Sequence, residues 1–479
     1  MSPDTHAHAR LLLQLCPGVS LKEEAGGILS ARYDRETLPL GKFSAGARSR
    51  AAELASGVQI FPARARDAPE DKEILDAGRR LALHGLVEYR LVGADGKDMA
   101  IIEPQMRDYA PRLPHIDEAT PLVLSRFAYL RRRGEDMVLE SPRANAAVML
   151  CDARLASALA SLAKPRTAAE LRAEGMFPGA ELLALLCDCQ MLHPFDAGKG
   201  LRASEGDDAL LLWEFHDLLF HARSTNGRHA NPTGGLYAHA RLVPQPPAVR
   251  PAWPGPAIDL TKFPGASDSA CAALLRARHS ERVYDDQHPI TLAEVARLLD
   301  GAARIVSRQS IGDGGGDEPG LDIAARPYPS GGASYELELY LAVGRCEGLP
   351  RGFYHYDAER HALVAIAAND RQLGALIDDG QFAMGAPWPP QILITIAARF
   401  GRVSWKYSGF AYALILKHVG VLMQTLYLMS TEMNLGACAI GVGDIDLFSR
   451  ITGLPFHVEG PVGHMAIGSR AADGGSDRL

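Results

Sequence analysis

The stretch from Arg399 to Gly443, RFGRVSWKYSGFAYALILKHVGVLMQTLYLMSTEMNLGACAIGVG, decides how the rest of the chain is organised. Apolar residues in its middle recur every three or four positions: Tyr412, Ile415, Leu416, Val419, Leu422, Met423, Leu426, Met429 and Met433. This period predicts a helix over residues 410–434, about 37 Å long at about 1.5 Å per residue. The apolar run is interrupted by Lys417, His418, Gln424 and Glu432. We therefore expect a buried core or interface helix and no membrane span.

Both ends of this helix carry residues suited to chemistry. Lys406 and Tyr407, just upstream, are titratable side chains of the kind that transfers protons. Just downstream, the small residues of 436–441 (GACAIG) allow backbone amides to approach a flat ligand closely. Taken alone, a surface lysine and a packing tyrosine would be the simpler interpretation of the first pair.

Length and composition describe a globular chain of several domains. A chain of 479 residues is too long for one ordinary core, and its length predicts two to four domains. With 47% hydrophobic and 22% charged residues, it has the composition of a soluble globular protein. A net charge of −7 gives no basic footprint, so we expect no nucleic-acid partner.

The cysteines and the N-terminus bear on metal binding and location. Seven scattered cysteines, an odd number, argue against a disulfide framework. Cys187 and Cys189 would make half a metal site, but no second pair with ligand spacing accompanies them. We expect two thiols on a helix and no metal. The residues before Pro17 carry one arginine and a short apolar core, which is no secretory signal, so we expect a cytoplasmic protein.

Turn signals and proline density divide the chain into four predicted segments. Short apolar runs that alternate with turns predict an N-terminal α+β unit, with a hairpin around residues 93–97. Seven prolines between positions 244 and 264 fix φ and block both helix and central strand, so they predict an extended tether. The predicted segments are 1–120, a small α+β unit that could act as a peptide clamp; 121–205, a winged-helix-like unit; 206–265, an amphipathic helix and the tether; and 266–479, the catalytic part.

The second segment is interpreted as winged-helix-like from the order of its elements. Two strands around a charged turn at 133–135 precede predicted helices at 144–162, 167–174 and 179–192. Winged helices often bind DNA, but here the arginines stand in an acidic chain. A solvated charged face is the better interpretation, with peptide docking as the alternative, for Arg126, Arg131, Arg132 and Arg133.

Two stretches of the last segment predict contacts with a ligand. Arg278, Ser280 and Arg282 alternate, so in an extended segment they lie on one face. Two guanidiniums and a hydroxyl suit a phosphate, with charge-assisted hydrogen bonds of about 1.5–3 kcal/mol each, although a surface arginine pair is commoner. Later, Ser330-Gly331-Gly332 precedes a predicted strand at 336–343. Small residues there let the backbone lie against a planar ring, or simply form a loop.

Several motifs, in order, resemble one family. They are RHSER at 278–282, RPYPSGGASYELELYL at 326–341, GFYHYD at 352–357, WKYSGFAYALILKHVGVLMQTLYL at 405–428, NLGACAIGVGD at 434–444 and GHMAIGSR at 463–470. This set is similar to the nitroreductase superfamily and, within it, to the SagB-type peptide dehydrogenases, which include the cyanobactin oxidases. Upstream, EFHDLLFHARS at 214–224 also resembles the segment that precedes the flavin domain in that group.

The resemblance implies a homodimeric α+β flavin fold with FMN at the dimer interface, preceded by units like winged-helix peptide clamps. In such a fold the RHSER segment and Arg470 would hold the FMN phosphate and ring edge. Residues 330–332 would line the isoalloxazine, and residues 436–441 would contact it from the other side. The implied cofactor contacts are Arg278, His279, Ser280, Arg282, Pro329, Ser330, Gly331, Gly332, Gln424, Gly436, Ala437, Cys438, Ala439, Ile440, Gly441 and Arg470.

The implied activity is the oxidation of thiazolines or oxazolines, formed from Cys, Ser or Thr of a ribosomally made precursor peptide, to thiazoles or oxazoles. One ring hydrogen leaves as a proton and one as a hydride to the flavin, so a base must lie nearby. Members of the family carry a Lys–Tyr pair implicated in catalysis. By that resemblance we expect Lys406, buried beside the flavin, to take the proton and Tyr407 to orient it or the heterocycle. A cyclodehydratase is an implied partner.

Some residues depart from the pattern of many relatives. Where those carry an arginine-rich stretch and an acidic residue, this chain has Ser408-Gly409-Phe410 and Lys417-His418-Val419-Gly420, which places it nearer the cyanobactin and thiopeptide-like branch. Two alternative functions stay open. An NAD(P)H-dependent nitroreductase or flavin reductase would share the FMN cradle but needs no long accessory region. A catalytically silent scaffold would bind a leader peptide within a cyclodehydratase complex.

Overall fold

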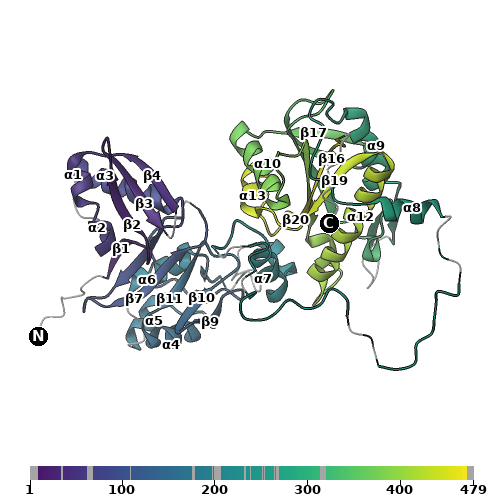
Figure 1. Cartoon of the computed structure of the whole chain (residues 1–479). Helices are drawn as coiled ribbons and strands as arrows, with labels where there is room; N and C mark the ends of the chain where they lie inside the picture. The colour runs from purple at the N-terminus through teal and green to yellow at the C-terminus, as the bar shows by residue number, and fades with distance from the viewer. Residues whose placement is uncertain are drawn as a thin grey trace, which may run out of the picture. The chain divides into compact units, whose positions relative to one another are not determined.

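The computed structural model of the chain describes residues 9–471, apart from 34–35, 62–67, 108, 175–178, 197, 199–206, 231–232, 238, 251, 253, 264, 266–268 and 313–319. The chain forms two compact units, each with its own helices and strands (Figure 1). Unit 1 comprises residues 1–223 and 227–230, and unit 2 comprises residues 224–226 and 231–479. The mixture of helices and strands confirms the predicted α+β class.

Unit 1 is built on a seven-stranded antiparallel sheet with the strand order β5-β1-β6-β7-β11-β10-β9. Its strands are β1 Arg10–Leu15, β5 Val58–Phe61, β6 Val87–Val92, β7 Asp98–Pro104, β9 Tyr129–Arg133, β10 Asp136–Glu140 and β11 Ala146–Leu150. The hairpin predicted around 93–97 joins β6 to β7, and the charged turn at 133–135 joins β9 to β10.

This sheet corrects two predictions about unit 1. Strand β7 pairs with β11 in the register Ile102 to Val148, so the sheet runs across the predicted boundary after residue 120. The residues predicted as a winged-helix-like unit therefore share one compact unit with the first segment. The prediction of helix from residue 144 is wrong over 146–150, because the pairing with β7 forms a strand there. Sequence-distant pairing of this kind leaves no local signal.

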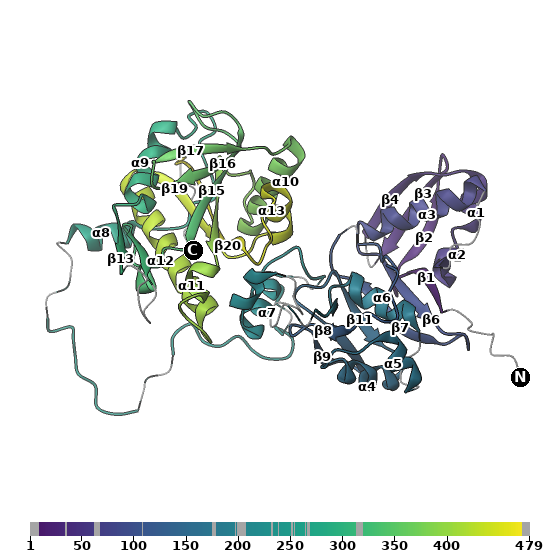
Figure 2. The same ribbon diagram turned by 180° about the vertical axis from the view of Figure 1, so that it is seen from behind.

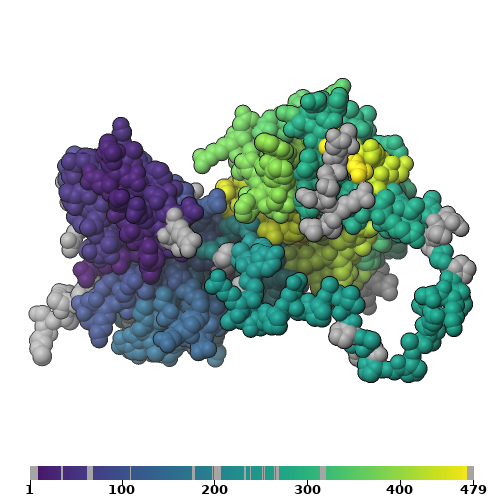
Figure 3. All heavy atoms as spheres, viewed as in Figure 1, coloured from purple at the N-terminus to yellow at the C-terminus, as the bar shows by residue number. Residues whose placement is uncertain are grey.

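Smaller elements complete unit 1. A three-stranded sheet of order β2-β3-β4 and a two-stranded pairing of β8 with β12 flank the main sheet. These strands are β2 Ser20–Glu24, β3 Ile28–Tyr33, β4 Glu36–Lys42, β8 Leu122–Leu124 and β12 Leu192–Pro194. The helices are α1 Ala45–Arg50, α2 Glu53–Ser56, α3 Pro69–Ala82, α4 Ala153–Ser161, α5 Ala168–Ala173, α6 Ala180–Asp188 and α7 Phe215–Arg223, with a 3-10 turn at Asp208–Leu212. In Figure 3 the early (purple) and later (blue) residues of unit 1 form two lobes.

Unit 2 is built on a six-stranded antiparallel sheet of order β17-β16-β15-β18-β20-β19. Its strands are β15 Leu337–Val343, β16 Gly352–Asp357, β17 Ala362–Ile366, β18 Ile392–Arg399, β19 Leu435–Ile440 and β20 Glu459–Ser469. Seven of the eight residues of β18 are buried, as its continuous apolar run predicts for a central strand. A separate hairpin pairs β13 Ser307–Ile311 with β14 Leu321–Ala325.

Helices cover both faces of this sheet (Figure 2). On one face, α10 Asp370–Met384 and α13 Ile445–Thr452 pack their apolar residues into a cluster with β15, β18 and β19. The other face carries α12 Ala411–Glu432 and α9 Leu292–Ala303, which contact each other. The remaining helices are α8 Ala270–Ala277 and the one-turn α11 Gly401–Ser404.

The long helix predicted at 410–434 is α12. By length and composition it is the only described helix that could cross a membrane, a test that buried core helices of soluble proteins also pass. In this fold α12 packs against β19, β20 and α9, and nine of its residues are buried. An exposed stripe runs along its opposite side through Ala413, Lys417, Gly420 and Gln424.

The proline-rich segment has no helix or strand among its described residues, as the sequence predicts. Pro251 and Pro264 lie outside the described residues. The two units divide upstream of this segment, where Ser224–Asn226 already belongs to unit 2. The backbone of Asn226 hydrogen-bonds to Gly443 and Ile445, which explains why these three residues leave unit 1.

Candidate functional site

A tight turn precedes strand β15 and forms one end of the candidate site. The turn spans Gly331–Ala333 and has left-handed backbone at Gly332 (φ 60°) and Ala333 (φ 51°); Tyr335, two residues after it, is also left-handed (φ 41°). Left-handed backbone is uncommon for residues with a side chain, so the surroundings must hold this turn in shape. The Tyr335 amide donates to Ser330 Oγ at 3.0 Å, and Arg402 Nε on α11 donates to the Ser334 carbonyl at 3.1 Å.

The predicted catalytic pair lies directly against this turn. A Cβ added to Gly332 would lie 2.5 Å from Tyr407 Oη and 2.6 Å from Lys406 Nζ, so only glycine leaves room for both. The ammonium of Lys406 also lies 5.5 Å from the centre of the Tyr407 ring. The structure therefore brings together four residues that were predicted separately: Gly331, Gly332, Lys406 and Tyr407.

The chain by itself leaves this pair at the surface. Lys406 is exposed and Tyr407 is only partly buried, whereas the sequence analysis expects a buried lysine. The two residues follow α11, a one-turn helix at the surface, and precede Phe410, which is 48% exposed.

Two residues that the sequence analysis did not include in the site hold the turn from beneath. His418 on α12 accepts a hydrogen bond at Nε2 from the Gly331 amide, at 2.7 Å. Its Nδ1 lies 2.7 Å from Oε1 of Glu336, which is fully buried. The available signals were a histidine on the apolar face of a predicted core helix and a glutamate at the start of a strand.

The RHSER segment forms a second cluster, against the other half of α12. Ser280 Oγ lies 2.7 Å from Tyr427 Oη, and the guanidinium of Arg278 lies 5.1 Å from the centre of the Tyr427 ring. Tyr427 Oη also accepts a hydrogen bond from the Ala439 amide on β19, at 2.8 Å. Tyr427, a residue the sequence analysis missed, thus links this segment to the small-residue strand.

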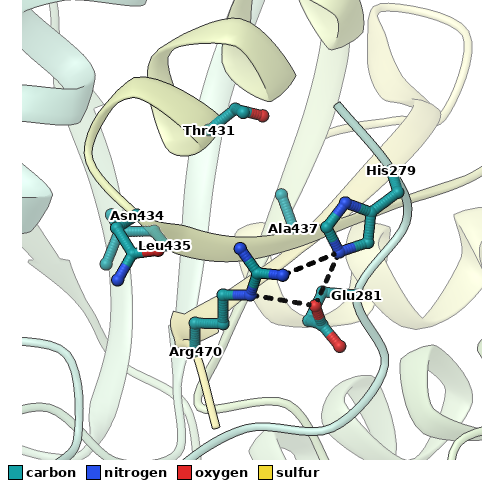
Figure 4. A pocket seen from close by; sticks show the side chains of 7 residues that line it. All are labelled: His279, Glu281, Thr431, Asn434, Leu435, Ala437 and Arg470. Carbon is teal, nitrogen blue, oxygen red and sulfur yellow. Dashed lines mark hydrogen bonds and ion pairs between the residues drawn. The ribbon is translucent and has the colours of Figure 1, made fainter. Parts of the chain in front are cut away.

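The predicted phosphate contacts do not all lie together. Arg282 Nε donates to the Met384 carbonyl at the end of α10, at 3.1 Å. Arg470 was expected beside Arg278 and Ser280, but it lies beside His279 and Glu281. Its Nη2 is 3.5 Å from His279 Nε2, and its Nε is 3.5 Å from Glu281 Oε2. Figure 4 shows these three side chains around a cavity of about 20 Å³. The reason is that extended backbone places residues 279 and 281 on the face opposite to 278 and 280.

Residues 436–440 of the small-residue run belong to β19, the edge strand of the sheet, and Gly441 directly follows the strand. The Glu281 amide donates to the Ala437 carbonyl at 2.8 Å, so the RHSER segment runs along this edge. A Cβ on Gly436 would lie 3.0 Å from the Glu281 side chain, which shows how close the two segments approach. Cys438 and Ile440 point into the core cluster, where burial raises the pKa of the Cys438 thiol.

The remaining predicted contacts lie at the surface. Pro329 and Gly441 are exposed, and Gln424 belongs to the exposed stripe of α12. The described residues include no group of three or more His, Cys, Asp or Glu side chains that could hold a metal ion.

The two clusters lie on one helix. Tyr427 and His418 are nine positions apart, which at about 1.5 Å per residue corresponds to about 14 Å along α12. One cluster offers cationic and hydroxyl groups, and the other offers a glycine turn beside a lysine and a tyrosine. This arrangement suits a ligand with an anionic end and a planar reactive end.

Comparison with known proteins identifies two domains. Residues 122–230 match the sequence model of the family described as Cyanobactin oxidase ThcOx, and residues 275–469 match that of the Nitroreductase family. These two domains confirm the resemblance drawn from the sequence motifs and the nitroreductase-like fold of the C-terminal part. A candidate nitroreductase of Methanocaldococcus jannaschii is 29% identical over 182 residues, which cover 38% of this chain and 82% of that protein.

Solved structures show more distant similarity. The Escherichia coli microcin synthetase McbBCD complex with truncated pro-MccB17 bound contains a chain 18% identical, with a TM-score of 0.38, covering 56% of this chain and 97% of that chain. A candidate nitroreductase of Ralstonia eutropha is 21% identical, with a TM-score of 0.34, covering 47% and 97%. A candidate nitroreductase of Desulfovibrio desulfuricans in complex with FMN is 15% identical, with a TM-score of 0.27, covering 44% and 93%.

Proposed function

We propose that this chain, in which a cyanobactin oxidase domain precedes a nitroreductase-family domain, oxidises azoline rings of a modified peptide to azoles with FMN as cofactor. The observation that carries the proposal is the packing of Lys406 and Tyr407 against the Gly331–Ala333 turn, within the domain expected to bind flavin. An acid–base pair at a glycine turn is what removal of a proton from a carbon next to a flat cofactor requires.

The residues present fit FMN. Within the described part of the chain, Arg278 has no carboxylate within ion-pair distance, so its guanidinium on the Tyr427 ring can face a phosphate, whereas Arg282 donates to the Met384 carbonyl. Ser280 and Tyr427 supply hydroxyl groups beside Arg278. At the other cluster, Gly331 and Gly332 carry no side chain of their own, and the ends of Lys406 and Tyr407 lie beside Gly332. When bound, FMN supplies an acceptor for a hydride.

In this proposal the protein's own residues handle the proton and the orientation. Lys406 takes the ring proton while the second ring hydrogen leaves as a hydride, which leaves the ring aromatic. Tyr407 Oη lies beside Gly332, as Lys406 Nζ does. Its hydroxyl orients either the heterocycle or the Lys406 amine for the proton transfer. Removing such a base typically slows a reaction by about 10²- to 10⁴-fold.

We further propose that the precursor peptide binds unit 1. A groove of about 370 Å³ lies along β2, an edge strand of the small sheet, and is closed by Arg48, Ser49 and Ala52 of the α1–α2 region. An edge strand beside a groove can accept an extended peptide as an additional strand. A cyclodehydratase would supply the azoline, and a second copy of the chain would complete the flavin site, as the family resemblance implies.

A visible absorbance spectrum of the purified protein, recorded without oxygen before and after adding an azoline-containing peptide, tests the proposal. Flavin absorption that bleaches on adding the peptide supports it. Bleaching with NADPH alone favours a flavin reductase, and no flavin absorption even after FMN is supplied favours a non-catalytic scaffold. The same peptide without azolines is the control, because it must leave the spectrum unchanged.

A further inference from the structure

The hydrogen bonds beneath the turn fix the protonation of His418. The Gly331 amide donates to Nε2, so Nε2 carries no proton, and the remaining Nδ1–H donates to Glu336 Oε1. His418 is therefore a neutral imidazole in one defined tautomer, with a carboxylate behind it. Both nitrogens are occupied, so this imidazole cannot take a proton from a substrate without releasing the turn.

The surroundings of Glu336 are unusual for a buried acid. Its side chain is fully buried, and no described lysine or arginine lies within ion-pair distance of it. Its partners are His418 Nδ1 at 2.7 Å and Ser330 Oγ, which lies 3.4 Å from Oε2. A buried carboxylate without a cationic partner is costly, so it is retained where its hydrogen bonds fix something specific.

These hydrogen bonds converge on the turn. Gly331 is held through His418, and Ser330 contacts Glu336 while accepting from the Tyr335 amide. The residues held in this way flank the two left-handed side-chain-bearing residues, Ala333 and Tyr335. On its outer side the same turn carries Gly332, against which Lys406 and Tyr407 pack.

We propose that His418 and Glu336 are positioning residues that lock the Ser330–Tyr335 turn and thereby place Lys406 and Tyr407 for reaction. The proposal rests on the proposed function for the identity of the reaction, but not for the state of the turn. His418 holds the turn because its Nε2 accepts the hydrogen bond from the Gly331 amide. Glu336 accepts a hydrogen bond from Nδ1–H, which keeps the proton on Nδ1 and leaves Nε2 unprotonated. Neither residue touches the substrate.

A matched pair of variants tests this assignment. The amide oxygen of Gln reaches the position of Nε2, whereas the shorter Asn side chain reaches only that of Nδ1. We expect His418→Asn to lower kcat at least 10-fold with little change in KM, and amide hydrogen exchange across residues 329–335 to quicken at least 10-fold. In His418→Gln, kcat and the exchange rate should return most of the way to their wild-type values. In Glu336→Gln, both should lie between the values of His418→Asn and His418→Gln. Ser430→Ala is the control, since Ser430 is buried on the same helix away from the turn.

Two outcomes overturn the proposal. In the first, His418→Asn has the same amide hydrogen exchange rates and the same kcat as the Ser430→Ala control. In the second, His418→Gln is as impaired as His418→Asn although both melt at the temperature of the wild type. If neither variant folds, ¹⁵N NMR of histidine-labelled wild-type protein decides: a proton on Nδ1 of His418 supports the proposal, and a proton on Nε2 overturns it. If the wild type oxidises no azoline, the proposed function fails, but the exchange comparison still decides the role of His418.

Discussion

The two units each bury a glutamate, and the two glutamates are satisfied in different ways. Glu140 of unit 1 lies 2.5 Å from Arg131 and 3.3 Å from Arg223, with a side chain 3% exposed. Burial acts to raise the pKa of this carboxyl, but the hydrogen bond to Arg131 and the charge of Arg223 outweigh it and leave the pKa below its ordinary value. Glu336 of unit 2 has a neutral imidazole and a hydroxyl instead.

The difference shows what each buried charge is for. In unit 1 two arginines balance the charge, and the ion pairs join the β9–β10 hairpin to α7. In unit 2 the carboxylate accepts a hydrogen bond from His418, and His418 accepts one from the Gly331 amide. This chain of hydrogen bonds reaches the backbone turn against which Lys406 and Tyr407 pack. The first arrangement holds elements together, whereas the second determines the shape of one loop.

The largest expected effect is a loss of activity in unit 2. Lys406→Ala, with FMN bound, should lower azoline turnover by about 10²- to 10⁴-fold, because the base is lost. Initial rates with an azoline peptide measure this. Lys417→Ala, which removes an exposed lysine from α12, is the control and should turn over normally. Full turnover by Lys406→Ala would remove Lys406 from the mechanism.

The second effect concerns stability. Glu140→Ala leaves Arg223, whose side chain is 20% exposed, without its acid, and should lower the free energy of unfolding of unit 1 by about 3 kcal/mol. Urea unfolding followed by a probe in unit 1 measures it. Turnover per folded molecule should not change. A loss of turnover without a loss of stability would contradict the contrast drawn between the two glutamates.

A pair of glycines sharpens the comparison further. Gly332→Ala and Gly385→Ala both place a side chain at left-handed backbone (φ 60° and 63°), which costs about 1–2 kcal/mol in each case. Only the first adds a Cβ that meets Lys406 and Tyr407, since nothing lies within 4 Å of a Cβ at Gly385. Turnover should therefore fall in Gly332→Ala alone. Equal turnover in the two variants would show that the turn tolerates displacement of the pair.

The last effect is a pH dependence of stability within unit 2. Complete burial lowers the pKa of His464 to about 4 in the folded chain, below the ordinary value of 6.5. Between these values the unfolded chain binds a proton that the folded chain does not, so stability falls as the pH decreases from about 6.5 to about 4. The slope that His464 contributes is at most about 1.4 kcal/mol per pH unit.

His464→Gln should flatten the pH dependence of stability in this range, whatever its effect at neutral pH. Chemical unfolding of both proteins at several pH values gives the two slopes. Parallel slopes would show that His464 binds its proton equally in the folded and the unfolded chain, which contradicts the lowered pKa.

The sequence predicted what depends on local pattern. The helix expected at 410–434 spans Ala411–Glu432, and the helix expected at 167–174 spans Ala168–Ala173. What failed depends on partners distant in sequence. The strand over 146–150 exists because it pairs with β7, and Arg470 lies beside Glu281 because the segment after β20 pairs with Tyr284, far away in sequence.

The candidate site shows the same division. Lys406, Tyr407 and the glycines were found from local motifs and from family resemblance. His418, Glu336 and Tyr427 were missed because on an apolar helix or strand a single polar residue has many ordinary explanations. Only the fold shows that the imidazole meets an amide and a carboxylate at once.

Tyr427 and His418 give the two ends of the site one shared support, helix α12. If an anion at Tyr427 also orders the turn at His418, that coupling must be reciprocal, so loosening the turn would lower the affinity for the anion by the same factor. Phosphate affinity, compared between the wild type and the His418 variants, would then report how well the reactive end is ordered.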